Sequence, residues 1–324
     1  MRFDAIVVGG SFAGQSAAMQ LARARRSVLI IDGGMPRNRF AKAAHGFLGQ
    51  DGKAPHAIMQ EAMRQLAAYP DVEVIQGDVI NASKTLDGFA VTLATGQALC
   101  AGRLVLATGV IDELPSLPGL QERWGVSVLH CPYCHGYEVA DLELGVLGSH
   151  PMSAHQAGLM PDWGPTTYFT QGVYEPDADQ TAHLTARGVR VVHSPVVELL
   201  GAAPALDGVR LADGQVIEIR ALFVAPRTHL ASPLAAQLGC AVDEGPLGPF
   251  LRVDDWKQTT VAGVYAAGDA AMPMHNATLA SASGVMAGVG AHQSLAKEIA
   301  APAITGLAPI PGAANRHYAS SDVR

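Results

Sequence analysis

Short apolar runs alternate with a helical pattern at the start of the chain. The run at residues 5–8 is apolar and rich in β-branched side chains, which is typical of a buried parallel strand. It leads into a glycine-containing turn at 9–14, and a helical pattern follows. A second apolar run at 27–32 ends in Asp32. Together these segments predict a βαβ unit of about thirty residues, the size of a dinucleotide-binding unit.

The same alternation continues along the chain. Strand-like runs recur at 72–75, 89–93 and 104–107. A second α/β pattern is predicted from strands at 144–147, 166–170 and 189–193, helices at 153–160 and 177–187, and hairpin signals at 207–208 and 213–214. A run at 264–269 precedes a small-residue helix from Ala277 to about Ala291, and the tail from Ala301 is expected to be irregular. The two βαβ starts suggest two related nucleotide-type domains.

The composition of the 324 residues is that of a globular protein, with 49% hydrophobic and 16% charged residues. The formal charge is −7 and no basic block is present, so nucleic acid is not an expected partner. The first residues lack the features of a signal peptide, and no apolar run is long enough to span a bilayer. We therefore expect a cytoplasmic protein without membrane contact. Cys100 and Cys240 stand alone in apolar surroundings and are expected in the core.

The turn at 9–14 meets the demands of a pyrophosphate site. Gly9 and Gly14 permit a tight turn and close packing of a helix whose N-terminus would face the phosphates. Ser11 stands where a second glycine is usual, but its hydroxyl can donate to a phosphate. Asp32 can accept hydrogen bonds from ribose hydroxyls. An ordinary strand, turn and helix without a ligand would also fit this pattern.

Cys131-Pro132-Tyr133-Cys134 is the strongest chemical signal in the chain. The spacing suits a disulfide that closes a small loop, and such thiols often have a lowered pKa. His135 follows directly and can take a proton when a thiol attacks. Zinc would need further ligands, and no second Cys pair or spaced His pair occurs. A purely structural disulfide or a glutaredoxin-like site would also fit the spacing; the latter belongs to a small domain, whereas this motif lies mid-chain.

The order of these features resembles the low-molecular-weight thioredoxin reductase superfamily over nearly the whole chain. The features are the turn 9–14, Asp32, the sequence Ala107-Thr108-Gly109, the pair Cys131 and Cys134, and Ala267-Gly268-Asp269. The resemblance implies an α/β fold with two Rossmann-like domains of three-layer ββα type, the second inserted in the first. An FAD-binding domain would comprise residues 1–114 and 245–324, and a pyridine-nucleotide-type domain residues 115–244. It also implies a homodimer.

Asp269, which precedes the small-residue helix, could hold the ribityl chain of a flavin, although a Gly-Asp pair is otherwise a common turn. The predicted FAD-binding residues are Gly9, Gly10, Ser11, Phe12, Ala13, Gly14, Asp32, Gly33, Arg37, Asn38, His45, Thr108, Gly109, Gly268, Asp269, Asn276 and Ala277. No metal site is expected.

Several positions depart from the pattern of NADPH-using members. The second turn, 147–153, carries His150 at the middle glycine position, and Pro151 removes a backbone N–H donor. After the next strand, 170–175 contains no arginine for a 2′-phosphate and ends in Glu175. His275 and Asn276 replace a usual Arg-Gln pair, and His135 replaces the usual acid after the cysteines. NADPH binding is therefore expected to be weak or absent, unless the loops rearrange.

The departures are similar to one branch of the superfamily, the flavoenzymes that close disulfides in natural products such as gliotoxin, holomycin and romidepsin. The shared motifs are 131–138, Arg37-Asn38 and 45–52. The resemblance implies FAD-dependent oxidation of a small dithiol to an intramolecular disulfide. Because the nicotinamide site lacks its usual residues, O2 is the expected electron acceptor. In the roles carried over from the family, Cys131 exchanges with substrate, Cys134 faces the flavin and His135 is the base. Two further functions stay open: a thioredoxin-type reductase fed by NADPH or ferredoxin, and a nucleotide-binding scaffold without chemistry.

Overall fold

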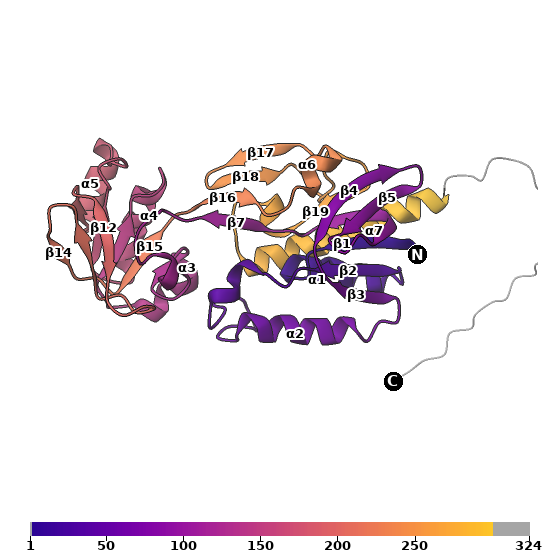
Figure 1. Ribbon diagram of the computed structural model, residues 1–324, viewed down its shortest axis with the longest axis horizontal. Coiled ribbons are helices and arrows are strands. Elements are labelled where there is room, and N and C mark those ends of the chain that lie inside the picture. The colour runs from indigo at the N-terminus through magenta and orange to yellow at the C-terminus, as the bar shows by residue number, and fades with distance from the viewer. Residues whose placement is uncertain (1, 301–324) are drawn as a thin grey trace, which may run out of the picture.

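The computed structural model describes residues 2–300, which form two bodies, each built around a parallel β-sheet (Figure 1). The larger body contains the first strands and the last helix of the described chain, and the smaller one contains its middle part. The class is α/β with two Rossmann-like domains, the second inserted in the first, which confirms the predicted class. The domain boundaries given above stay predictions.

The strands of the larger body and of the connection are β1 (Arg2–Val8), β2 (Val28–Asp32), β3 (Val72–Gln76), β4 (Val79–Thr85), β5 (Gly88–Leu93), β6 (Ala98–Leu106), β7 (Val110–Glu113), β16 (Arg227–Leu230), β17 (Val242–Gly245), β18 (Gly248–Leu251) and β19 (Val264–Ala266). Those of the smaller body are β8 (Val128–Leu129), β9 (Leu144–Leu147), β10 (Thr166–Phe169), β11 (Arg190–Val192), β12 (Val196–Leu200), β13 (Gly208–Leu211), β14 (Val216–Ile217) and β15 (Ala221–Val224).

The α-helices are α1 (Phe12–Arg23), α2 (Pro55–Leu66), α3 (Pro132–His135), α4 (Ser153–Leu159), α5 (Ala178–Ala186), α6 (Leu234–Leu238) and α7 (Ala277–Ala300). The 3-10 helices are η1 (Arg37–Phe40), η2 (Gln121–Arg123), η3 (Tyr137–Val139), η4 (Met160–Asp162) and η5 (Gly268–Ala271).

The sheet of the larger body has the strand order β3-β2-β1-β6-β5-β4, and β19 also pairs with β6. β1 runs parallel to both β2 and β6, while β4 and β5 are antiparallel additions. The chain therefore leaves β1 toward one side of the sheet and returns on the other. In such a sheet, ligands bind beyond the carboxyl end of the strands at this switch point.

Alternate residues of β1 enter two different cores, which explains its continuous apolar sequence. Ala5 and Val7 pack on the side of α1 and α7, whereas Ile6 and Val8 pack on the side of the antiparallel strands. The small residues of α7 allow it to pack closely against α1. A Cβ on Gly284 would collide with the backbone of α1, so α7 can lie directly against α1. The two helices form one layer over the sheet.

The smaller body has an all-parallel sheet of order β11-β10-β9-β15-β8, and a separate antiparallel sheet of β12, β13 and β14. One face of the parallel sheet packs with α4 and α5, whose core includes Ala157 and Leu184. The other face packs against the antiparallel sheet, with Phe169 and Val209 in that core. This three-layer unit carries α3, the helix that follows Cys131.

Two antiparallel strands join the bodies. β7 leads out of the larger body, and β16 returns beside it, with Val110 opposite Leu230 and Glu113 opposite Arg227 (Figure 1). β16 also lies against β18 of the larger body. The disulfide segment therefore reaches the larger body from a unit that is attached by one strand pair.

Most predicted strands and helices are present, with some corrections. The helix that begins at Ala277 runs to Ala300, beyond the expected end near Ala291. Cys240 is buried as expected, but the prediction for Cys100 was wrong: it is exposed, because β6 alternates there and its neighbours Leu99 and Ala101 take the inward positions. The tail from Ala301 lies outside the described residues. Among residues 2–300, no helix has the length and apolarity needed to cross a bilayer.

Candidate active site

The turn after β1 brings the start of α1 close to the strand ends. Gly9 has φ of +105°, and a Cβ on it would collide with the carbonyl oxygen of Ala107. A Cβ on Gly14 would collide in turn with the carbonyl oxygen of Gly9. Glycine is therefore required at both positions for α1 to begin where it does.

The N-terminus of α1 faces a cradle of backbone and carboxylate groups. Ser11 precedes α1 and makes no side-chain hydrogen bond to its first turn. The Gly10 N–H donates to Oδ1 of Asp32 at 3.1 Å, and a Cβ on Gly10 would lie 2.7 Å from the Asp32 side chain. Phe12 and Ala13 begin α1, Gly33 follows β2, and Thr108 and Gly109 join β6 to β7. Helix-start N–H groups beside a carboxylate match the pyrophosphate and ribose of a dinucleotide.

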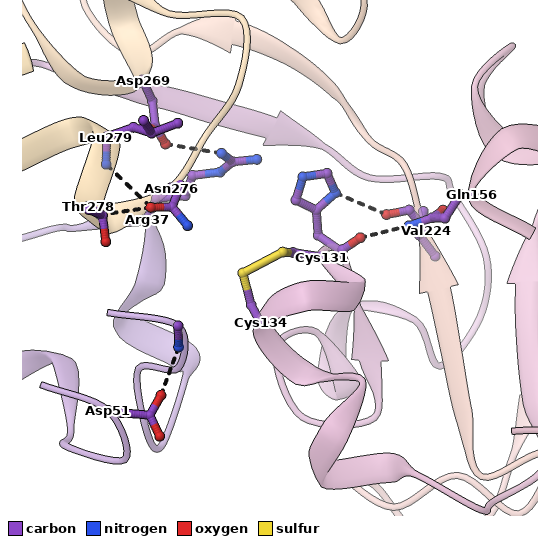
Figure 2. Close-up of a disulfide and its surroundings, with 12 residues drawn as sticks. Arg37, Asp51, Cys131, Cys134, Gln156, Val224, Asp269, Asn276, Thr278 and Leu279 are labelled. Atoms are coloured by element: carbon purple, nitrogen blue, oxygen red, sulfur yellow. Dashed lines mark hydrogen bonds and ion pairs between the residues drawn. A yellow bond between two sulfur atoms is a disulfide. The ribbon is translucent and has the colours of Figure 1, made fainter. Parts of the chain in front are cut away.

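A second set of predicted residues lies where β19 ends and α7 begins. Gly268 and Asp269 start η5, and Ala277 is the first residue of α7. Oδ1 of Asn276 accepts hydrogen bonds from two N–H groups of the first turn of α7, at 2.8 and 3.3 Å (Figure 2). Nδ1 of His275 is buried and has no hydrogen-bond partner within residues 2–300. This end of the sheet thus offers a polar atom that a bound group could satisfy.

Arg37 joins this region to the strand that leaves the larger body. Its guanidinium donates to both carboxylate oxygens of Asp112 in β7, at 2.9 and 2.5 Å, and to Oδ2 of Asp269 at 3.1 Å. Burial alone would lower the pKa of Arg37, but the hydrogen bonds and charges of Asp112 and Asp269 raise it above its usual value. Arg37 was predicted to bind the cofactor together with Asn38, its neighbour in η1. Its charged end holds two carboxylates of the protein, and its role in binding the cofactor stays a prediction.

Cys131 and Cys134 form a disulfide on the side of the smaller body that is turned toward Arg37, Asn276 and Asp51 (Figure 2). Cys131 immediately precedes α3, so the pair occupies the first turn of a helix. Trp163 supports this turn: the ring of Tyr133 meets it edge-on at 5.7 Å, and a Cβ on Gly136 would lie 2.8 Å from it. The disulfide is thereby held on a fixed element.

His135 ends α3 next to the disulfide. Burial lowers the pKa of His135; the charge of Glu138 opposes this shift and that of His45 adds to it. A neutral imidazole beside a disulfide can accept a thiol proton. His45, which was predicted to bind the cofactor, lies against the disulfide segment: its Nε2 is 3.4 Å from Oε1 of Glu138, and its Nδ1 is 3.7 Å from Oδ1 of Asp51.

Comparison with known families supplies the assignment. Residues 3–284 match the family described as pyridine nucleotide-disulphide oxidoreductase. The chain belongs to this family. It is a flavin-dependent disulfide oxidoreductase, and FAD is its cofactor.

Relatives and solved structures agree with this family. The chain is similar to thioredoxin reductase tcpT of Claviceps purpurea, with 31% identity over 88% of this chain and 92% of the relative. It is equally similar, at 31% identity, to thioredoxin reductase sirT of Leptosphaeria maculans, over 92% of this chain and 96% of that one. An oxidoreductase from Agrobacterium tumefaciens superposes with a TM-score of 0.88 and 49% identity over 92% of this chain and 99% of its own. The structure of HlmI gives 0.86 and 37%, over 92% and 94%.

The residues of this oxidoreductase fit FAD. The uncapped start of α1 and Asp32 suit the pyrophosphate and the adenosine ribose, while Asp269 and Nδ1 of His275 follow β19 at the same carboxyl end of the parallel strands. The Cys131–Cys134 pair lies on the side of the smaller body that is turned toward Arg37 and Asn276, near this end of the sheet (Figure 2). The assignments of individual residues to FAD stay predictions.

The second turn of this oxidoreductase is closed by its own side chains. The hydroxyl of Ser153 accepts hydrogen bonds from the N–H groups of Ser149, at 3.2 Å, and His150, at 3.1 Å. Nδ1 of His150 accepts from the N–H of Met152 at 3.1 Å, and Pro151 has no N–H. The N–H groups of Ser149, His150 and Met152 are therefore paired within the turn, while no side chain caps the start of α4.

The segment after β10, where NADPH users bind the 2′-phosphate, carries an acidic side chain that is held by hydrogen bonds. The hydroxyl of Thr170 donates to Glu175 at 2.6 Å, and Nδ1 of His193 lies 2.7 Å from the other carboxylate oxygen. Between this turn and β17–β18 lies a cavity of about 610 Å³, which is lined by Glu113, His150, Gln171, Arg227 and Glu244 among others. An anionic 2′-phosphate in this cavity would meet the carboxylates of Glu113 and Glu244, opposed by the charge of Arg227.

Three residues of this region were not among the predicted site residues. His130 precedes Cys131, and burial, with the charge of Arg37, lowers its pKa to about 4, so its imidazole is neutral near pH 7. Its position next to the cysteine was the available signal. Asp112 and Glu138 meet Arg37 and His45 across long stretches of sequence, and no local pattern marks them.

Proposed function

We propose that this oxidoreductase oxidises a small-molecule dithiol to an intramolecular disulfide at Cys131–Cys134, with O2 as the final electron acceptor. The observation that carries the proposal is the second turn, where Ser153 takes the N–H groups that NADPH would need. If NADPH does not supply electrons, a substrate dithiol can supply them. The similarity of residues 131–138 and 45–52 to the natural-product branch supports the same direction.

The exchange needs two steps at the cysteine pair. A substrate thiolate attacks Sγ of Cys131, the disulfide breaks, and Cys134 leaves as a thiolate. The second substrate thiol gives its proton to His135, and its thiolate attacks the substrate sulfur that is bound to Cys131. The substrate disulfide closes and Cys131 leaves as a thiolate. The substrate loses two electrons and two protons, and the cysteine pair gains the two electrons.

His135 holds the proton of the second thiol in this scheme. Because burial lowers its pKa, the imidazole is neutral near pH 7 and ready to accept a proton. FAD, when bound, supplies a two-electron acceptor for the reduced cysteines and passes the electrons on. The residues predicted for FAD binding, the two domain ranges and a homodimer are further parts of the proposal.

The test is anaerobic mixing of the purified yellow protein with dithiothreitol and, separately, with NADPH. We expect dithiothreitol to bleach the flavin absorbance, NADPH to leave it nearly unchanged, and air to restore it. Fast bleaching by NADPH would contradict the proposal. A protein that is bleached by dithiol but not reoxidised by air would contradict the role of O2.

A disulfide reductase is the second candidate, because the relatives tcpT and sirT are named thioredoxin reductases. NADPH or ferredoxin would then supply the electrons. The same mixing experiment separates the two functions, with reduced ferredoxin as a third reagent. Bleaching by ferredoxin alone would favour the reductase.

A further inference from the structure

Two segments from different bodies meet beside the disulfide. The loop at 44–53 belongs to the larger body, and residues 131–138 carry the cysteine pair on the smaller one. Their contact is the pair His45 and Glu138, with 3.4 Å between Nε2 and Oε1. The charges of Glu138 and His45 are also the two that act on the pKa of His135. The imidazole of His45, from the larger body, thus acts on the pKa of His135, the proposed base.

The loop at 44–53 holds His45 in a fixed position. Ala44 and Lys53 form an antiparallel bridge that closes the loop, with an N–H to carbonyl distance of 2.8 Å. The ring of Phe47 meets that of Phe12, the first residue of α1, at 5.7 Å and nearly at right angles. The loop is therefore anchored to the same helix that begins at the predicted pyrophosphate site.

Asp51 is the most exposed of the four side chains in this group. His135 is half-buried, the side chains of His45 and Glu138 are 23% and 39% exposed, and that of Asp51 is 66% exposed. Oδ1 of Asp51 lies 3.7 Å from Nδ1 of His45 and accepts the N–H of Gly46 at 2.8 Å. Imidazole and carboxylate groups alternate from the base to the surface.

We propose that His45 is a positioning residue for dithiol oxidation: it holds Glu138 beside His135 and, with Asp51, carries the proton taken by His135 to solvent. This rests on the proposed function, in which His135 is the base. Each substrate releases protons next to a half-buried imidazole, and that imidazole must lose its proton before the next turnover. The groups that face it are Glu138 and His45, and those that face His45 are Glu138 and Asp51.

The experiment follows the steady-state oxidation of dithiothreitol, as O2 consumption, by the FAD-loaded protein between about pH 6 and 9. We expect His45→Gln to lower the limiting rate roughly tenfold, less than the ~10²–10⁴-fold of a group that itself transfers the proton in the chemical step, and to leave the dithiothreitol concentration for half-maximal rate unchanged. Added imidazole should restore most of the lost rate, because it can take the proton directly. Glu138→Gln, which keeps the size of the side chain, should show the same rescue.

His193→Gln is the matched control, since His193 also pairs with a glutamate, at 2.7 Å, but lies in the smaller body after β11. It should oxidise dithiothreitol at the normal rate. A normal rate in His45→Gln and Glu138→Gln would overturn this inference but not the proposed function. A loss of rate that imidazole does not restore would do the same. Absence of bleaching by dithiothreitol in the unchanged protein would overturn the proposed function as well.

Discussion

The two strand-to-helix turns of this oxidoreductase have the same place in two related sheets but differ in what their N–H groups contact. At the first turn, Ser11 leaves the start of α1 uncapped, and Asp32 lies beside it. At the second, the hydroxyl of Ser153 takes two backbone N–H groups, and a proline removes another. In the proposed function, this buried hydroxyl distinguishes the second turn, which binds no NADPH, from the first.

The comparison also shows how a fold can keep a unit whose ligand site is closed. The second unit still packs its parallel sheet and still presents the disulfide to the larger body (Figure 2). Its remaining task, in the proposed function, is to hold Cys131 and Cys134. The closed turn costs nothing in that task, because the cysteines lie on α3 and not on the turn.

The largest expected effect comes from adding a Cβ to the glycine of each turn where it would collide with a backbone carbonyl oxygen. Gly14→Ala would drive a Cβ into the carbonyl oxygen of Gly9, and we expect loss of about 3 kcal/mol of stability or more, with little flavin in the purified protein. Gly148→Ala would place a Cβ 2.7 Å from the carbonyl oxygen of Thr170. It should lower the melting temperature but retain flavin. Equal flavin loss in both variants, measured by absorbance, would contradict the difference between the turns.

A smaller effect is expected from opening the second turn. Ser153→Ala leaves the N–H groups of Ser149 and His150 without their acceptor, which should cost about 1–3 kcal/mol. NADPH at millimolar concentration should raise the melting temperature of this variant but not of the unchanged protein. Ser11→Ala is the control, because that hydroxyl caps no N–H, and it should not lower the stability of the flavin-free protein. An equal NADPH response in all three proteins would show that the hydroxyl does not close the turn.

The smallest expected effect concerns the carboxylate after β10. The hydrogen bond from Thr170 lowers the pKa of Glu175; burial opposes this shift, and His193 adds to it. The ionised Glu175 thus stabilises the fold above its usual pKa, and this contribution disappears as the pH falls through the lowered pKa. Glu175→Gln should cost about 0.5 kcal/mol at pH 7, as for an exposed pair, and nothing in strong acid. Urea unfolding at both pH values checks this, and a difference that grows in acid would contradict it.

Local patterns in the sequence were enough to predict the two turns and the disulfide. Gly9, Gly14 and Asp32 follow buried strands at fixed spacing, and Cys131 and Cys134 are three residues apart. These features depend on residues that are close in the chain, so their spacing in the sequence reveals them.

Contacts between distant segments could not be predicted in this way. Arg37 and Asp112 are 75 residues apart, and their ion pair depends on how η1 and β7 meet. The contact of His45 with Glu138 depends in turn on the placement of the two bodies. The error for Cys100 has a different, local cause. The first residues of β6 alternate between exposed and buried, and Cys100 takes an exposed position between Leu99 and Ala101.

The paired strands β7 and β16 have a consequence for how such proteins can diversify. The chain enters and leaves the smaller body through adjacent points, with Val110 opposite Leu230. A unit with neighbouring entry and exit can be exchanged as a cassette without disturbing the sheet order of its host. If the proposed function holds, exchange of such a cassette would change the source of electrons and leave the flavin-binding scaffold intact.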